Sequence, residues 1–358
     1  MSRWQTALRN APLLLQGMYE YNWASRQRPL PLREWMFPVT YRCNARCLMC
    51  DIWQGDKGGE LPTAGWATIL QDPLFATVQS INLTGGEPTL RQDLDELVYL
   101  LIERLPALRR ITLTTNALDR QRVTQTVAQL AGVSAAKGIG LFVGVSLDGI
   151  GKVHDEMRNI PNAFERVQET IGSLSGHRLG VNCTLTRRNL DDAPNVLRWC
   201  SERGLPVNFI VASFTDSYYA NTEAESALSM GADQRSQLAS LLLQLADQRS
   251  VGNLAAYFYA DLARMVEQEA PRTTPCVFQK SGAIIDARGE MQYCVYSQVL
   301  GNVAKQSALE LYTGASNLAH RQEMLARHCA TCTMSCFLEL GLAKDARRYI
   351  RFLLGGLP

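Results

Sequence analysis

Short runs of β-branched and apolar residues alternate with helical patterns from about residue 36 to residue 213. This alternation is typical of βα units, which build a parallel sheet covered by helices. Six such units favour an α/β fold with a curved partial (β/α)6 barrel over a flat sheet. The expected strands span residues 36–41, 78–84, 109–115, 139–147, 179–186 and 207–214. Helical patterns lie between them, for example at 91–105 and 193–204.

Each expected strand has a polar and an apolar face, because successive side chains point to opposite sides of a sheet. The polar faces carry Asn82 and Thr84, Thr112 and Thr114, Gly144, Ser146 and Asp148, and Asn182, Thr184 and Thr186. The apolar faces must pack against the covering helices, which leaves the polar faces inside. A polar interior predicts a ligand cavity rather than a packed core.

Composition and charge restrict the class of protein. With 358 residues, 46% of them apolar and 20% charged, the chain can form a soluble large domain and a smaller one. A net charge of +2 argues against a dedicated nucleic-acid-binding protein. The sequence contains no run of eighteen apolar residues, so it predicts no membrane span. Residues 1–35 are expected to be helical rather than a signal peptide, and the expected location is cytoplasmic.

The ten cysteines fall mainly into two clusters, three at 43–50 and five between 276 and 336. Two tight clusters without an export signal favour metal binding in a reducing compartment over disulfides. The remaining two, Cys183 and Cys200, lie on apolar faces of an expected strand and helix. We expect both to be buried as small hydrophobic residues.

The first cluster, Cys43, Cys47 and Cys50, has the spacing C-x₃-C-x₂-C. Thiolates this close together suit zinc or an iron–sulfur cluster. None of the four histidines pairs with this loop in the manner of a zinc site, although a structural zinc remains the alternative. Three cysteines would bind three irons of a [4Fe–4S] cube and leave the fourth open to a substrate or cofactor, as in catalytic metal sites.

This cysteine motif resembles that of the radical S-adenosylmethionine (radical SAM) superfamily, and the resemblance extends over residues 36–214. "LTGGEP" at 83–88 resembles the family's GGEP motif, although the tetrapeptide alone also suits a plain turn. "VSLDG" at 145–149 with "HDEMRN" at 154–159 resembles a fourth-strand segment of members that carry auxiliary clusters. His154 and Asp155 would otherwise begin a surface helix.

The resemblance implies a [4Fe–4S] cluster on Cys43, Cys47 and Cys50, with the amino and carboxylate groups of SAM on its fourth iron. The implied SAM-binding residues are Gly85, Gly86, Glu87 and Pro88 of the GGEP motif, with Thr115, Asn116, Ser146, Asp148 and Asn182. The three residues Gly85–Glu87 would receive the amino group, because a carboxylate and exposed carbonyls suit an ammonium. Met49 departs from the family, where an aromatic residue is frequent, and we expect it to lie against adenine.

The second cluster resembles the SPASM/twitch extension of radical SAM enzymes. It consists of Cys276, Cys294, Cys329, Cys332 and Cys336, and residues 283–294 predict a hairpin around "ARGE". A full SPASM domain has seven motif cysteines and two auxiliary clusters. We therefore expect one auxiliary [4Fe–4S] cluster on the first four cysteines, with Cys336 a spare, an exchangeable or a second-site ligand. A zinc ribbon on the same four cysteines is the alternative.

These features predict five segments: an N-terminal helical segment (1–35), the radical SAM core (36–214), a helical connector (215–270), a SPASM/twitch-like domain (271–340) and a C-terminal amphipathic helix (341–358). Only 42 residues precede Cys43, too few for the leader-binding module of many peptide-modifying relatives. The expected substrate is therefore a small polar molecule such as a sugar or aminocyclitol, to be dehydrogenated or epimerised.

The resemblance further implies an electron donor such as flavodoxin or ferredoxin. In an epimerisation, a free thiol such as Cys336 would be the catalytic hydrogen donor. Peptide modification with a separate leader-binding partner is one alternative function. A non-catalytic metal-binding scaffold is the other, and it would bind metal without cleaving SAM.

Overall fold

A computed structural model of the chain describes Tyr19 and residues 29–56, 58–248, 254–335, 350–352 and 354–356. The chain divides into two compact units. The larger unit comprises residues 32–229 and 282–318, and the smaller unit comprises 1–31, 230–281 and 319–358.

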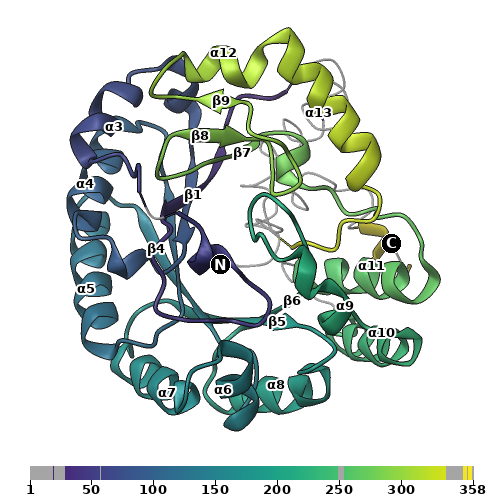
Figure 1. The fold of residues 1–358 in the computed structure, drawn as a ribbon. Helices are drawn as coiled ribbons and strands as arrows, with labels where there is room; N and C mark the ends of the chain where they lie inside the picture. Colours follow the sequence, from purple (N-terminus) through teal and green to yellow (C-terminus); the bar gives the residue numbers. More distant parts are fainter. Residues whose placement is uncertain are drawn as a thin grey trace. The chain divides into compact units, whose positions relative to one another are not determined.

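Six parallel strands form the centre of the larger unit, and helices lie outside them (Figure 1). The strands are β1 (Glu34–Thr40), β2 (Ser80–Gly85), β3 (Arg110–Thr115), β4 (Gly140–Ser146), β5 (Leu179–Leu185) and β6 (Val207–Val211). The helices are α3 (Thr63–Ile69), α4 (Leu94–Arg104), α5 (Arg120–Ala136), α6 (Lys152–Arg158), α7 (Ala163–Ser173) and α8 (Ala193–Glu202). The predicted partial (β/α)6 barrel is confirmed.

A hairpin from the second cysteine region extends this sheet. Strands β7 (Gly282–Ile285), β8 (Glu290–Gln292) and β9 (Gly301–Asn302) follow β1, so that the order is β6-β5-β4-β3-β2-β1-β7-β8-β9. The expected hairpin at 283–294 is present as the antiparallel pair β7–β8. Residues 282–318, which include α12 (Ala308–Thr313), therefore group with the core rather than with the rest of the expected segment 271–340, because β7 pairs with β1.

The apolar strand faces are buried as predicted, and no residue of the set Ile81, Leu83, Ile111, Leu113, Val143, Val145, Leu147, Val181, Cys183 and Leu185 exceeds 2% exposure. An aromatic group fills the space outside β1. Trp35 stacks on Phe37 with ring centroids 4.4 Å apart, and Trp66 of α3 and Phe75 pack against Trp35. This burial stabilises the outer layer and leaves the inner face for polar side chains.

The smaller unit contains α10 (Ala232–Ala246) and α11 (Leu254–Gln268), which lie within the expected connector at 215–270. Their buried side chains include Leu238, Leu242, Tyr257 and Phe258. Two further helices of the described residues are α9 (Glu225–Leu228), which belongs to the larger unit, and α13 (Ala315–His328), most of which belongs to the smaller unit. In the two units together, 3-10 turns lie at Ile52–Gln54, Pro73–Thr77, Pro88–Leu90, Leu190–Asp192, Thr222–Ala224 and Val277–Gln279.

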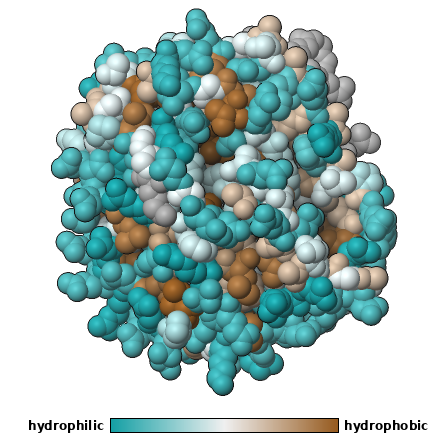
Figure 2. All heavy atoms as spheres, in the orientation of Figure 1, coloured by the Kyte–Doolittle hydropathy of each residue, from teal (hydrophilic) through white to brown (hydrophobic). Residues whose placement is uncertain are grey.

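Hydrophilic side chains cover most of the face shown in Figure 2, and apolar ones appear as separate small patches. Within the described residues, no helix is both long enough and apolar enough to cross a membrane. Most of the expected N-terminal helical segment (1–35) and C-terminal helix (341–358) lies outside the described residues.

Candidate functional site

The three cysteines of the first cluster lie in the loop that follows β1, at the carboxyl edge of the parallel strands. This edge is where α/β enzymes place their active sites. All three residues are partly exposed. Burial and the neighbouring Cys47 raise the pKa of Cys43 to about 11 and that of Cys50 to about 12. The loop therefore gathers sulfur donors at the expected position.

The donor set, three free thiols in one loop, suits an iron–sulfur cube. Among the described residues, no three His, Cys, Asp or Glu side chains converge as ligands of one ion. A [4Fe–4S] cube binds each thiolate at a different iron, so its ligands are spread further apart than those of zinc. Cys43, Cys47 and Cys50 would hold three of its irons.

The GGEP segment lies directly against the start of the cysteine loop. The N–H of Gly86 donates to the Thr40 carbonyl and that of Glu87 to the Arg42 carbonyl, both at 2.8 Å. A Cβ on Gly86 would lie 2.2 Å from the Arg42 oxygen, and one on Gly85 would lie 2.2 Å from the Thr40 oxygen. Glycine is required here because the two backbones touch.

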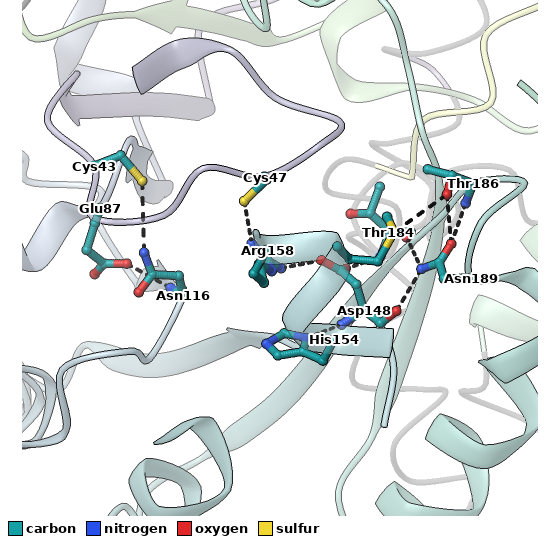
Figure 3. A network of polar contacts seen from close by, with 11 residues as sticks. Cys43, Cys47, Glu87, Asn116, Asp148, His154, Arg158, Thr184, Thr186 and Asn189 are labelled. Carbon is teal, nitrogen blue, oxygen red and sulfur yellow. Dashed lines mark hydrogen bonds and ion pairs between the residues drawn. The ribbon is translucent and has the colours of Figure 1, made fainter. Parts of the chain in front are cut away.

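Glu87 joins this segment to the end of β3. Its carboxylate is buried and accepts hydrogen bonds from the hydroxyls of Thr89 and Thr115, both at 2.8 Å, and from the Asn116 N–H at 2.7 Å. Burial raises the pKa of Glu87, and these donors offset part of that rise. The Asn116 amide in turn donates to the Asn44 side chain at 2.7 Å. The same amide lies 3.9 Å from Cys43 Sγ, as Figure 3 shows.

A buried ion pair lies on the other side of the cysteine loop. Arg158, the last residue of α6, places Nη2 2.7 Å from Oδ2 of Asp148, which has no exposed surface. Its Nη1 donates to Cys47 Sγ at 3.4 Å. Burial alone lowers the pKa of Arg158, but Asp148 and Cys47 raise it above its ordinary value, so the guanidinium is charged. Sequence reasoning gave Arg158 no role, although it lies within the "HDEMRN" motif.

His154 and Asp155 lie in the first turn of α6, and the side chain of His154 is fully buried. Its Nδ1 accepts the N–H of Asp148 at 3.0 Å, which assigns the remaining proton to Nε2. Burial, and to a smaller extent the neighbouring Arg158, lower the pKa of His154 to about 2. The imidazole is therefore neutral at physiological pH and fixes the backbone of the "SLDG" segment.

The segment that follows β6 holds the third cysteine, a role that sequence reasoning missed. The buried amide of Asn221 donates to the carbonyls of Met49 at 2.8 Å and Ser213 at 3.1 Å. The Asp51 N–H donates to the Tyr219 carbonyl at 3.0 Å. No spacing pattern marks Asn221, because its partner in the cysteine loop, the Met49 carbonyl, is a main-chain group 172 positions away.

Met49 itself is 7% exposed and packs in an apolar cluster with Met157 and Leu228. Its expected contact with adenine stays a prediction. The buried cluster shows that the side chain also anchors the loop to α6 and to the segment after β6.

Polar side chains occupy the inner faces of the strands, as expected. The Thr114 hydroxyl donates to the Asn82 side chain at 3.1 Å, and Asn208 donates to Asn182 at 3.4 Å. Ser146 pairs in register with Asn182 and, like it, is half-buried. These groups line the same side of the sheet as the expected SAM-binding residues.

The second cysteine cluster is divided between the two units. Cys276, Cys329 and Cys332 belong to the smaller unit, where burial raises the pKa of Cys332 to about 11 and Cys276 adds to the rise. Arg272 orders their loop by donating to the carbonyls of Cys332 at 3.1 Å and Met334 at 2.8 Å.

Cys294 follows β8 in the larger unit, and Cys336 lies outside the described residues. No disulfide links any two described cysteines. Cys183 and Cys200 are buried as predicted.

Comparison with known proteins identifies the core. Residues 37–200 match the Radical SAM superfamily. The solved structure of native anSMEcpe with bound AdoMet and a peptide has a TM-score of 0.61 at 16% identity, covering 91% of this chain and 100% of that one. Residues 37–200 of this chain therefore form a radical SAM domain.

Individual relatives match at moderate identity. Pre-heme d1 synthase of Dinoroseobacter shibae is 32% identical over 51% of this chain, which spans only 43% of that relative. The AdoMet-dependent heme synthase of Nitratidesulfovibrio vulgaris is 24% identical over 82% of this chain and 83% of its own length.

Proposed function

We propose that this chain is a radical SAM enzyme. A [4Fe–4S] cluster with bound SAM supplies, on one-electron reduction, a 5′-deoxyadenosyl radical that abstracts a hydrogen atom from substrate. The observation that carries the proposal is the contact between the GGEP segment and the cysteine loop, through Gly86 to Thr40 and Glu87 to Arg42. It brings the expected SAM-binding backbone beside the expected cluster ligands.

The residues of the site have separate roles in this proposal. Cys43, Cys47 and Cys50 hold the cluster, and the backbone around Gly85 and Gly86 receives the methionine amino group. Thr115, Asn116, Ser146 and Asn182 contact the carboxylate and ribose, while Met49 contacts adenine. Glu87 and Asp148 belong to the proposed SAM site as well, and the chain's own donors hold their carboxylates in place. Pro88 begins the turn that places Glu87.

Production of 5′-deoxyadenosine tests this proposal. The anaerobically reconstituted protein, given dithionite and SAM, is expected to release 5′-deoxyadenosine and methionine. The variant Cys47→Ala should release neither, whereas Cys200→Ala, which removes a buried thiol away from the site, should behave as the parent. A parent protein that binds iron but forms no 5′-deoxyadenosine would support the metal-binding scaffold instead.

For the substrate, we propose a small polar molecule that is dehydrogenated or epimerised. The inward-facing side chains Asn82, Thr114, Asn182 and Asn208 are uncharged hydrogen-bonding groups, which suit hydroxyl and amino substituents. A flavodoxin or ferredoxin would deliver the electron. An auxiliary [4Fe–4S] cluster on Cys276, Cys294, Cys329 and Cys332 would take up the second electron in a dehydrogenation. Cys336 keeps its proposed role as hydrogen donor in an epimerisation.

A tetrapyrrole is the second candidate substrate, because a heme synthase matches 82% of this chain. Measurements of 5′-deoxyadenosine with each candidate substrate distinguish the two. Deuterium transfer from a deuterated sugar or aminocyclitol into 5′-deoxyadenosine would support the first. A shift of the porphyrin absorption band on mixing with the protein, together with porphyrin-dependent 5′-deoxyadenosine formation, would support the second.

A further inference from the structure

Arg158 is a buried cation that touches a predicted cluster ligand (Figure 3). Its guanidinium bridges the Asp148 carboxylate, at 2.7 Å, and Cys47 Sγ, at 3.4 Å. The residue is 8% exposed and Asp148 is fully buried. In such surroundings water screens the charge only weakly, so the guanidinium acts strongly on the sulfur beside it.

Asp148, which holds the Arg158 guanidinium, is itself fixed by several hydrogen bonds. Oδ1 of Asp148 accepts the Thr184 N–H at 2.8 Å, and the Asp148 carbonyl accepts from Asn189 at 2.8 Å. These bonds leave Oδ2 directed at Arg158, as the close-up shows (Figure 3).

The backbone at the end of α6 binds the same loop. The carbonyl of Arg158 accepts the N–H of Arg46 at 3.2 Å, and the carbonyl of Met157 accepts the N–H of Leu48 at 3.0 Å. The two bonds flank Cys47 on both sides. Main chain and side chain of one helix end therefore fix the second cysteine of the motif, and this arrangement leaves the guanidinium little freedom to move away.

We propose that Arg158 is a positioning residue that holds Cys47 and raises the reduction potential of the cluster on Cys43, Cys47 and Cys50. The inference rests on the proposed function. Reduction adds one electron, supplied by a flavodoxin or ferredoxin in the cell or by dithionite in the test. A hydrogen bond to a ligand sulfur and a nearby positive charge both favour the form with the extra negative charge. Arg158 provides both.

Asp148 makes the sign of the effect on the reduction potential testable, because its carboxylate neutralises part of the positive charge of Arg158. Arg158→Met removes the sulfur donor and leaves a buried carboxylate, so the cluster should become harder to reduce. Asp148→Asn leaves the cation without its counter-charge, so the cluster should become easier to reduce. The expected order of potentials is Asp148→Asn, parent, Arg158→Lys and Arg158→Met, from highest to lowest.

The test is a redox titration of the reconstituted full chain, followed by electron paramagnetic resonance. The signal of this cluster is the one that disappears in Cys50→Ala. At a potential where little of the cluster is reduced, Arg158→Met should decrease the reduced fraction by about tenfold, which is 59 mV for one electron. The matched control is Arg46→Met, because Arg46 is exposed and donates to the carbonyls of Cys43 and Ala45 rather than to sulfur. Its potential should stay that of the parent.

An Arg158→Met protein with full iron content and the parent potential would overturn the proposal. If that variant does not retain iron, Asp148→Asn and Arg158→Lys decide, and an Asp148→Asn potential at or below that of the parent would contradict the proposed electrostatic role. Loss of the cluster from all three variants would also overturn it and leave Arg158 with a packing role only. A parent protein without any signal that depends on Cys50 would mean that the proposed function itself has failed.

Discussion

Gly86 illustrates how single residues shape this site. Its missing side chain allows the end of β2 to touch the main chain just before Cys43. The sequence indicated a turn or a SAM-binding motif at this position, and the structure adds a steric requirement from another segment.

We therefore expect Gly86→Ala to displace the cysteine loop. The new Cβ would lie 2.2 Å from the Arg42 oxygen, and overpacking of this kind costs about 1–3 kcal/mol. Urea unfolding should show this loss in the free energy of unfolding, and the variant should retain less iron after reconstitution. Gly132→Ala is the control, because no atom lies within 4 Å of a Cβ there and alanine favours the helix α5. Equal iron content in the two variants would contradict the steric explanation.

His154 gives a prediction for the pH dependence of stability. Its pKa of about 2 in the folded chain is below the value of about 6.5 in an unfolded one, so the unfolded chain binds the proton first. The free energy of unfolding should therefore fall as the pH drops below 6.5, by about 1.4 kcal/mol per pH unit for this group.

The variant His154→Asn removes this contribution. It should be less stable than the parent at pH 7.5, and the difference should shrink by about 2 kcal/mol at pH 5. Urea unfolding of the cluster-free proteins, followed by tryptophan fluorescence, measures both values. A difference that stays constant with pH would show that His154 is not buried in its neutral form.

At the scale of elements, α6 and the segment after β6 hold the cysteine loop from two sides. Helix α6 supplies the carbonyls of its last turn, which have no partner within a helix, to the N–H groups of Arg46 and Leu48. The segment after β6 supplies Asn221 to the Met49 carbonyl.

Asn221→Ala should loosen this loop without altering a cysteine. The change removes the hydrogen bonds from Asn221 to Met49 and Ser213, and each buried group left without a partner costs about 1–3 kcal/mol. We expect the reconstituted variant to lose iron to a chelator several times faster than the parent. Thr222→Ala is the control, because it removes only an exposed hydrogen bond to Asp216 in the same segment. An unchanged rate in Asn221→Ala would assign the loop's order to the other contacts.

Most elements of the core could be predicted from the sequence. The alternating faces of residues 109–115 and 179–186 appear as β3 and β5 with boundaries shifted by one residue or less. Strand β6 ends at Val211 rather than at 214, since the chain there turns toward the Asn221 segment. The periodicity of a strand indicates which of its faces is buried. It does not indicate where the strand ends because of a tertiary contact.

At the scale of the whole molecule, the expected ligands belong to different units. Cys43, Cys47, Cys50 and Cys294 are in the larger unit, and Cys276, Cys329 and Cys332 are in the smaller one. The two proposed clusters have no cysteine in common, so we expect that each can be removed while the ligands of the other are kept.

Iron and sulfide counting tests the two-cluster proposal. The reconstituted parent should contain about eight irons per chain, and the triple alanine variant at positions 43, 47 and 50 about four. The triple alanine variant at 276, 329 and 332 should also contain about four, and a variant with all six changes almost none. Cys183→Ala, which removes a buried thiol, is the control for loss of a cysteine as such. A parent with four irons, all lost with the first three cysteines, would exclude the auxiliary cluster.

The sequence by itself determined the partial barrel, its polar interior and the position of the cysteine loop, because strand periodicity and motif spacing are local properties of the chain. Only the tertiary structure placed β7 beside β1, and only it brought Arg158 to Cys47 and Asn221 to Met49. The Trp35 indole N–H likewise donates to the carbonyl of Ile285 in β7, 250 positions along the chain. No local pattern encodes them, since they depend on which strand and helix ends meet when the sheet curves. The three cysteines of "TYRCNARCLMCDIW" can therefore be recognised in the sequence, whereas the groups that hold them in place cannot.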